Sequence, residues 1–377
     1  MTGSGPRTAK KWPVLLLAAV LTVMPAGCMG VKQVNRISFV TVLGVEPGAD
    51  GGVRVHALAA IPAKYGSLSP DGASSGVSSA PDYILSAEGA DLSDALYKLK
   101  RKSARDIQFG HTKVVLFSDE LARQGLANQM DFLMRREELQ SILWIAITKG
   151  SPVPVMKMRT ATPEAVGDWL VDIFSQAGSD TAEIIPIMLY QFYDYMFEPG
   201  TTPYAAVIEP LPDEQTLTAK EMAVFGSDKL LGTIPAEDVK YVSLLRNSKV
   251  LPTTFTLPEE QISFVLLNEN SKIAWRNGRF KVRLELKLDL DQTSAGEMKA
   301  NRLADAEAKL NEKAKGEIEK LLAELQRLHA DPIGLGERYR LAHGGHLDKD
   351  EWLRRLFPEQ TFDVQVKAEI QRKGMLE

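Results

Sequence analysis

The sequence of 377 residues contains a single cysteine and only five histidines. One thiol cannot form an intramolecular disulfide, nor can it supply a multi-cysteine zinc or iron–sulfur site. The 45 basic and 49 acidic residues nearly balance, so the strong basic excess of a typical nucleic-acid-binding protein is missing. Hydrophobic residues at 44% and charged residues at 25% are typical of folded domains. The composition excludes a wholly disordered chain and predicts no nucleic-acid partner.

Motifs for metal-dependent or nucleotide-dependent catalysis are also missing. The chain has no H-E-x-x-H zinc motif and no phosphate-binding Walker loop. His343 and His346 flank two glycines without an acidic or cysteine cluster, so we expect no metal site there. Gly334-Leu335-Gly336 lacks the third glycine of a dinucleotide-binding loop and is expected to be a turn. We predict that the chain is not an enzyme and has no cofactor, catalytic residue or metal ligand.

The beginning of the chain has the layout of an export signal. Three basic residues without an acidic residue precede an apolar stretch at residues 12–27. This stretch is shorter than the about 20 residues of a membrane-spanning helix. The sole cysteine, Cys28, follows directly after two small residues. We predict a lipoprotein signal peptide at residues 1–27 and a lipidated Cys28 that tethers the mature chain to a membrane. An ordinary signal peptide with a chance cysteine is the alternative.

Hydrophobic patterning in the first half predicts strands that alternate with helices. Apolar or alternating segments predict strands at 37–45, 53–61, 83–88, 113–117, 142–148 and 205–209. Amphipathic segments predict helices at 91–104, 119–135 and 159–177, with a break of the second helix at Gly125 as an alternative. This alternation favours a mixed sheet covered by helices. His56, in the second strand, is expected to have a structural role.

The second half contains the clearest patterns. Apolar and charged residues alternate strictly in residues 281–291, which predicts a strand with one exposed face. Residues 297–330 carry leucine and alanine at steps of three and four, which predicts a long amphipathic helix. We expect this helix to pack on the preceding strand, and a dimeric coiled coil is the alternative. Further strands are expected at 221–225, 229–234, 262–267, 271–275 and 362–370, and a further helix at 235–245.

These elements define an α+β, or mixed α/β, fold with more than one domain. Four prolines in residues 198–214 indicate a domain transition. We therefore predict an N-terminal domain region at 28–198 and a C-terminal domain region at 199–377, with a further split near residue 268 as an alternative.

Two segments are candidate contact surfaces. Residues 190–197 contain five aromatic side chains, which favours a core or domain interface over a ligand cage. Residues 98–105 contain five basic side chains near the end of a predicted helix, where the helix dipole favours cations. A basic surface that faces lipid headgroups or a partner is the alternative for the second segment.

Several segments together resemble the Ger(x)C family, the lipoprotein C subunits of bacterial spore germinant receptors. The most specific similarity covers residues 101–126 and includes Phe109-Gly110-His111, which we expect to form a structural turn. Further similar segments are Val34-Asn35-Arg36 with 39–45, residues 131–133, residues 223–234, the block Asp331–Gly336, Trp352 and the final strand before Gly374.

This resemblance implies three mixed α/β domains, each a sheet packed with helices, and a role in nutrient-triggered spore germination. The implied partners are the A-type and B-type membrane subunits of a germinant receptor, together with membrane lipid bound through Cys28 and its palmitate-type acyl chains. The implied location is extracytoplasmic, on the outer face of the spore inner membrane. A membrane-tethered solute-binding lipoprotein, with a nutrient held near residues 190–215, is the alternative function.

Overall fold

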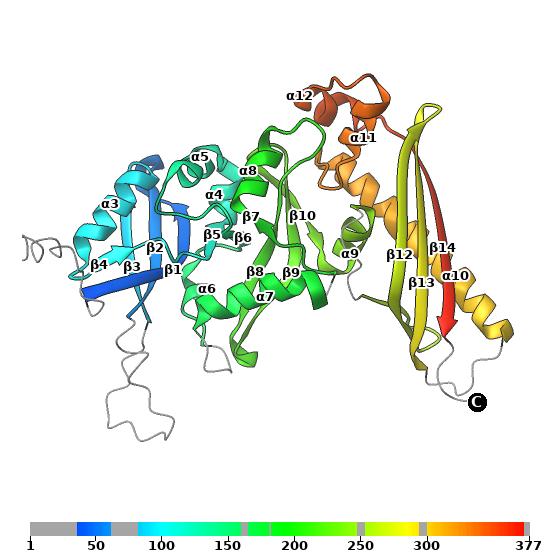
Figure 1. Ribbon diagram of the computed structural model, residues 1–377, viewed down its shortest axis with the longest axis horizontal. Helices are drawn as coiled ribbons and strands as arrows, with labels where there is room; N and C mark the ends of the chain where they lie inside the picture. The colour runs from blue at the N-terminus through cyan, green and yellow to red at the C-terminus, as the bar shows by residue number, and fades with distance from the viewer. Residues whose placement is uncertain are drawn as a thin grey trace, which may run out of the picture.

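The computed structural model describes residues 36–61, 82–159, 165–180, 182–246, 253–293 and 300–372. The predicted signal peptide at 1–27 and the predicted lipidation site Cys28 lie outside these residues. Two β-sheets lie at opposite ends of an elongated molecule, with helices between them and around the first sheet (Figure 1).

Four parallel strands form the centre of the first sheet, and an antiparallel hairpin extends it on each side. The strand order is β10-β9-β8-β6-β5-β1-β2-β3, and two short strands pair at its margin, β4 with β1 and β7 with β6. The bounds are β1 (Ile37–Pro47), β2 (Val53–Ala60), β3 (Asp82–Gly89), β4 (Asp106–Gln108), β5 (Val114–Ser118), β6 (Trp144–Thr148), β7 (Ile187–Met188), β8 (Tyr204–Leu211), β9 (Thr216–Phe225) and β10 (Leu230–Pro235).

Helices cover both faces of the centre of this sheet. In β5, Val115 and Phe117 belong to one buried cluster, and Val114 and Leu116 belong to another on the opposite face. The first cluster includes side chains from α3 (Leu92–Lys102), α4 (Asp119–Gln124), α5 (Ala127–Arg135), α8 (Leu189–Phe197) and α9 (Ala236–Leu245). The second includes α6 (Val153–Met156) and α7 (Val166–Asp180). The break between α4 and α5 falls at Gly125, whose φ of 124° confirms the predicted interruption.

The second sheet has the order β11-β12-β13-β14. Its strands are β11 (Thr254–Leu257), β12 (Ile262–Arg276), β13 (Arg279–Thr293) and β14 (Phe362–Arg372). A tight turn at Asn277 and Gly278, with φ values of 55° and 78°, joins β12 to β13. The expectation of separate strands at 262–267 and 271–275 is wrong, because a bulge between Leu266 and Asn268 lets one strand continue through both segments.

The long helix α10 (Ala300–Arg327) carries the chain from β13 to β14, which run parallel. Leu303, Leu310, Ile318 and Leu325 on one side of α10 are buried in the same core as the inward side chains of β13. Side chains of α10 also accept hydrogen bonds from backbone N–H groups of β14, so the helix packs on the sheet that contains the preceding strand and lies directly against β14. Smaller helices complete the connection: α11 (Leu335–Ala342), α12 (Lys349–Glu351) and the π-helical turn η5 (Trp352–Leu356).

The chain passes from the first sheet to the second between β10 and β11. Strands β8 to β10 follow the predicted transition at 198/199 in sequence but complete the first sheet, and residue 268 lies inside β12. The α+β class and the sheet-with-helices organisation are confirmed. The described residues form two sheets, and β8 to β10 pair with the first of them across the predicted sequence boundary. No helix in the described ranges has the length and apolar character needed to cross a membrane.

Candidate functional site

A buried polar joint connects the two sheets, and its centre is Asp331. The Asp331 carboxylate is fully buried and accepts hydrogen bonds from the backbone N–H groups of Gly334 at 2.9 Å and Leu335 at 3.0 Å. It also accepts from the N–H of Gly336 at 2.7 Å and from Nε1 of Trp352 at 3.1 Å. The turn expected at 334–336 lies earlier, at residues 332–333, and Leu335 and Gly336 already begin α11, so the N–H groups at the start of this helix surround a carboxylate.

Two features of the environment of this carboxylate shift its pKa in opposite directions. Burial raises the pKa of Asp331 above its ordinary value, and the hydrogen bonds from Leu335, Gly336, Trp352 and Gly334 lower it in part. All four partners are N–H donors, which suit an acceptor-only ionised carboxylate. Removal of the carboxylate would leave several buried donors without a partner.

The backbone around Asp331 is bonded directly to the segment that leads into β8 of the first sheet. The N–H of Asp331 donates to Oγ1 of Thr202 at 2.9 Å, and its carbonyl accepts from the N–H of Thr202 at 3.0 Å. A Cβ on Gly336 would lie 2.9 Å from the Cα of Gly200 and 2.7 Å from Nε1 of Trp352. The close approach of these backbones therefore requires glycine at position 336.

Two cations bind backbone carbonyls of the joint. Nζ of Lys349 donates to the carbonyls of Thr201, at 2.9 Å, and Tyr195. Burial lowers the pKa of Lys349 to about 8. The Arg246 guanidinium donates to Oη of Tyr195 at 3.1 Å and to the carbonyl of Pro332. These cations tie α8 and the end of α9 to the segment after α10.

The joint holds the two sheets in position. Its polar groups bond to one another and fix how the two sheets are placed, so we assign it a structural role. In the sequence, Asp331 stands out only as part of the block Asp331–Gly336 that resembles the Ger(x)C family. The available signal was an aspartate directly before a glycine-rich turn, a pattern in which a side-chain oxygen can accept from the following N–H groups.

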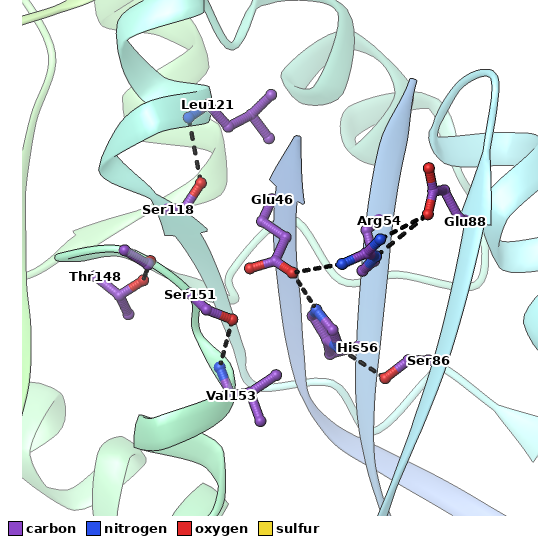
Figure 2. Close-up of polar contacts among 11 residues, drawn as sticks. Glu46, Arg54, His56, Ser86, Glu88, Ser118, Leu121, Thr148, Ser151 and Val153 are labelled. Carbon is purple, nitrogen blue, oxygen red and sulfur yellow. Dashed lines mark hydrogen bonds and ion pairs between the residues drawn. The ribbon is translucent and has the colours of Figure 1, made fainter. Parts of the chain in front are cut away.

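A second polar cluster lies across β1, β2 and β3, as Figure 2 shows. His56 is 5% exposed; its Nδ1 lies 2.7 Å from Oγ of Ser86 and its Nε2 lies 3.0 Å from Oε1 of Glu46. Arg54, on the same strand, forms an ion pair with Glu88 at 2.9 Å. Both ring nitrogens of His56 are thus bound within the protein, which fits the structural role expected for it.

The carboxyl ends of β5 and β6 carry polar groups that terminate the strands. This edge of a parallel sheet often binds ligands. Oγ of Ser118 accepts from the N–H of Leu121 at 3.2 Å and begins α4 (Figure 2). Oγ1 of Thr148 donates to the carbonyl of Gly150 at 2.8 Å, and the N–H of Gly150 donates to Asp119 at 2.9 Å. These groups use their hydrogen bonds to cap the following elements.

The aromatic run at 190–197 is divided between the core and the surface. Phe192 is fully buried and packs against Phe225 with ring centroids 4.9 Å apart, as the predicted core role requires. Tyr190 and Phe197 point outward and are 38% and 63% exposed. Tyr193 packs on Phe197 at 5.1 Å. The outer side of α8 therefore presents aromatic rings to solvent.

The basic cluster at 98–105 is largely paired. Lys98 forms an ion pair with Asp94 at 2.7 Å, and Lys100 forms one with Glu138 at 3.1 Å. Nζ of Lys102 donates to a backbone carbonyl in β3. This arrangement favours a solvated helix end over a free cationic surface.

The segment Phe109-Gly110-His111 forms the expected turn, with the N–H of Thr112 bonded to the carbonyl of Phe109 at 2.9 Å. Phe109 is buried, and the His111 ring packs on Phe39 with centroids 4.3 Å apart. This segment contributes packing.

The two histidines at 343 and 346 belong to a short turn after α11. Nδ1 of His343 lies 2.8 Å from the carbonyl of Tyr339, and the two rings stack at 3.9 Å. Within the residues that the structure describes, no group of three or more His, Cys, Asp or Glu side chains could hold a metal ion.

Comparison with known proteins defines the class. Residues 30–210 match the family model described as spore germination protein N-terminal domain, and residues 220–374 match the model described as spore germination B3/GerAC like, C-terminal. Together the two models account for most of the chain in consecutive order. The chain therefore belongs to the family of GerAC-like spore germination proteins.

Individual relatives agree with this assignment. The chain is 23% identical to YfkR of Bacillus subtilis (strain 168) over 378 residues, which cover 96% of each chain. It is 21% identical to spore germination protein KC of the same organism, with 96% of this chain and 95% of the relative covered. The crystal structure of the GerBC protein matches 87% of this chain and 96% of its own, with a TM-score of 0.51 and 16% identity, and so has a similar fold.

Proposed function

We propose that this chain is a lipid-anchored, non-enzymatic subunit of a nutrient germinant receptor, attached through Cys28 to the outer face of the spore inner membrane. The observation that carries the proposal is the consecutive match of both spore germination domains over residues 30–374. The position of the only cysteine, directly after an apolar segment at 12–27, supports the lipid anchor. In this proposal the chain acts through contacts with A-type and B-type membrane subunits.

The exposed side of α8 is the surface that we assign to those contacts. Phe197 is 63% exposed and Tyr190 is 38% exposed, and Ile142 beside them is 58% exposed. The N–H of Tyr190 bonds to the carbonyl of Ser141, which places α8 next to the segment that holds Ile142. Exposed aromatic and aliphatic side chains in contiguous positions mark surfaces for protein association.

The test is a pull-down of a tagged chain from spore membranes solubilised in a detergent that preserves complexes. We expect the wild-type chain to recover two multi-pass membrane subunits and Phe197→Glu to recover much less of both. Tyr97→Glu is the matched control, because Tyr97 is 64% exposed but lies on α3, away from α8. Equal recovery by both variants would overturn the assignment of α8, and recovery of the tagged chain alone would overturn the receptor proposal.

The anchor is tested separately with Cys28→Ala. We expect this variant to leave the membrane fraction and to reduce germination in response to nutrients. Retention of the variant in membranes with a normal response would contradict the lipid anchor. Calorimetry with amino acids, sugars and nucleosides examines the alternative solute-binding function, and saturable heat for one of them, together with recovery of the chain alone, would favour that alternative.

A further inference from the structure

A concentrated basic surface lies at the turn end of the β12–β13 hairpin. Five side chains form this hairpin basic patch, and all five are exposed. They are Lys272, Arg276, Arg279, Lys281 and Arg283. The chain as a whole has a formal charge of −4, so the patch opposes the overall sign of the protein.

The register of the hairpin places like charges directly opposite each other. Lys272 pairs with Arg283, and Arg276 pairs with Arg279. Directly opposite residues in an antiparallel pair lie on the same face of the sheet, where like charges are destabilising. In the part of the chain that the structure describes, none of the five cations forms an ion pair with a carboxylate. Asp363 of β14 lies beside Lys281, but neither of the two directly opposed pairs is relieved by an ion pair in the described residues.

The remainder of the same face is built differently. Farther along β13, Glu285 lies opposite Asn270 and beside Lys367 of β14, and Lys287 lies beside Glu369. Nδ2 of Asn270 donates to Glu285 at 3.2 Å. Opposite signs alternate there, as expected for a solvated sheet face. Directly opposed cations on this face are thus found, among the described residues, at the turn end.

The patch borders a hollow of about 270 Å³. Four of its cations line this hollow, together with one carboxylate and one amide. The lining side chains are Lys272, Arg276, Lys281, Arg283, Asp363 and Gln365. Nε2 of Gln365 lies 3.5 Å from Oδ1 of Asp363, so the hydrogen-bond partner of this carboxylate is an uncharged amide. The hollow is therefore lined by four cationic groups and one carboxylate, which gives it a net positive charge.

The opposite face of the hairpin is firmly packed. The Trp275 ring lies 4.3 Å from that of His343, and its Nε1 donates to Gln360 at 3.0 Å. Phe280 stacks on Phe362 at 5.7 Å. These contacts hold the strands that carry the patch, which keeps the cations close together before any ligand arrives.

We propose that the hairpin basic patch is a binding site for a phosphate-bearing anion. Guanidinium groups donate two parallel hydrogen bonds to phosphate oxygens, and lysine adds a point charge. An anion in the hollow would remove the repulsion between the opposed cations. A different role for these charges is protection of an open strand edge, since β11 pairs only with residues 262–265 of β12. The experiment separates these two roles.

The test uses the whole chain with Cys28→Ala, so that no acyl anchor can bind lipid. Binding is measured by calorimetry with sodium tripolyphosphate and by flotation with vesicles of phosphatidylglycerol, with phosphatidylcholine vesicles as the reference. The test variant is Lys281→Gln with Arg283→Gln. The matched control is Lys287→Gln with Lys367→Gln, which removes the same charge from the same face outside the patch. We expect the test variant to bind at least about tenfold more weakly and the control to bind as the parent does.

The two probes identify the source of the phosphate. Patch-dependent binding of tripolyphosphate supports a soluble ligand, and patch-dependent binding of phosphatidylglycerol vesicles alone supports a lipid headgroup. Equal weakening by the test and control variants would show a general charge effect and overturn the site. Absence of binding to both probes would also overturn it, and if the test variant then self-associates, the charges protect the strand edge.

Discussion

The first sheet is covered by helices on both faces of its centre, whereas the second sheet is covered on one face only. In β5, neighbouring residues Val115 and Leu116 are both fully buried, in different core clusters. In β13, Leu284 is fully buried and its neighbour Glu285 is exposed. The first sheet therefore uses its central side chains for stability. The second sheet has a whole face available for contacts with other molecules.

The joint between the sheets is where we expect the largest effect of a single substitution. Asp331→Ala leaves three backbone N–H groups and the Trp352 indole without their acceptor in a buried site. We expect the free energy of unfolding in urea to fall by about 3–5 kcal/mol. If the variant unfolds in two separate transitions, the joint is what couples the unfolding of the two sheets in the wild-type chain.

A matched control for the joint is Asp348→Ala. Asp348 also accepts a backbone hydrogen bond, from the N–H of Glu351 at 2.8 Å, but at the exposed start of α12. Loss of such a cap costs about 1 kcal/mol. Equal losses for the two aspartates would contradict the central role of the buried carboxylate.

Neighbouring positions in β5 and β13 test the comparison directly. We expect Val115→Ala and Leu116→Ala each to lower the free energy of unfolding by about 2–4 kcal/mol, because each leaves a cavity on a covered face. In β13, Leu284→Ala should cost a similar amount, and Glu285→Ala should stay within about 0.5 kcal/mol of wild type. Chemical denaturation of the four variants measures this pattern, and a large loss for Glu285→Ala would show that the outer face of the second sheet is covered.

The contrast between the sheets also explains how much of the fold the sequence predicted. The strict alternation in 281–291 and the apolar spacing in 297–330 are local signals, and β13 and α10 appear where they predict them. The pairing of β8 with β6 is not local, so the proline-rich segment gives no sign that the strand within it lies in the first sheet. A pattern of residues along one segment does not encode its partner strand.

The same reason accounts for what was missed at the candidate sites. Asp331 receives its donors from the following turn and from Trp352, 21 residues later. The hairpin basic patch follows from the two-residue turn at Asn277 and Gly278, which places Arg276 opposite Arg279 and Lys272 opposite Arg283. The opposition of Lys272 to Arg283 can be deduced from the sequence once this turn is recognised, whereas the position of Asp363 beside Lys281 depends on the non-local pairing of β13 with β14.

Glu269 gives the second sheet a pH dependence. It lies on the inner face of β12, opposite Leu286, and its Oε2 is buried without a hydrogen-bond partner among the described residues. Burial raises the pKa of Glu269 from its ordinary value of 4.5 to about 7. A raised carboxyl pKa destabilises the folded chain above pH 7, and this loss disappears as the pH falls from 7 towards 4.5.

We therefore expect Glu269→Gln to be more stable than wild type at pH 8, by about 1 kcal/mol after solvent screening, and equal to it near pH 4.5. Thermal or urea unfolding of both proteins across this range provides the measurement. A constant difference at all pH values would indicate a packing effect of the amide in place of the titration.

The smallest expected effect concerns the exposed face of the second sheet. Arg279→Gln with Arg283→Gln removes one member of each directly opposed pair of cations, so we expect a gain of about 0.5 kcal/mol at low salt. The gain should vanish at about 1 M salt, where screening acts over about 3 Å. Lys287→Gln with Lys367→Gln removes cations that lie beside Glu369 and Glu285, so it should give a small loss in the same urea titrations. If the first double variant is more stable than wild type at low salt and the second is less stable, the cations at the turn end lower the stability of the chain and those elsewhere on this face maintain it. Equal signs would mean that the two ends of the face do not differ.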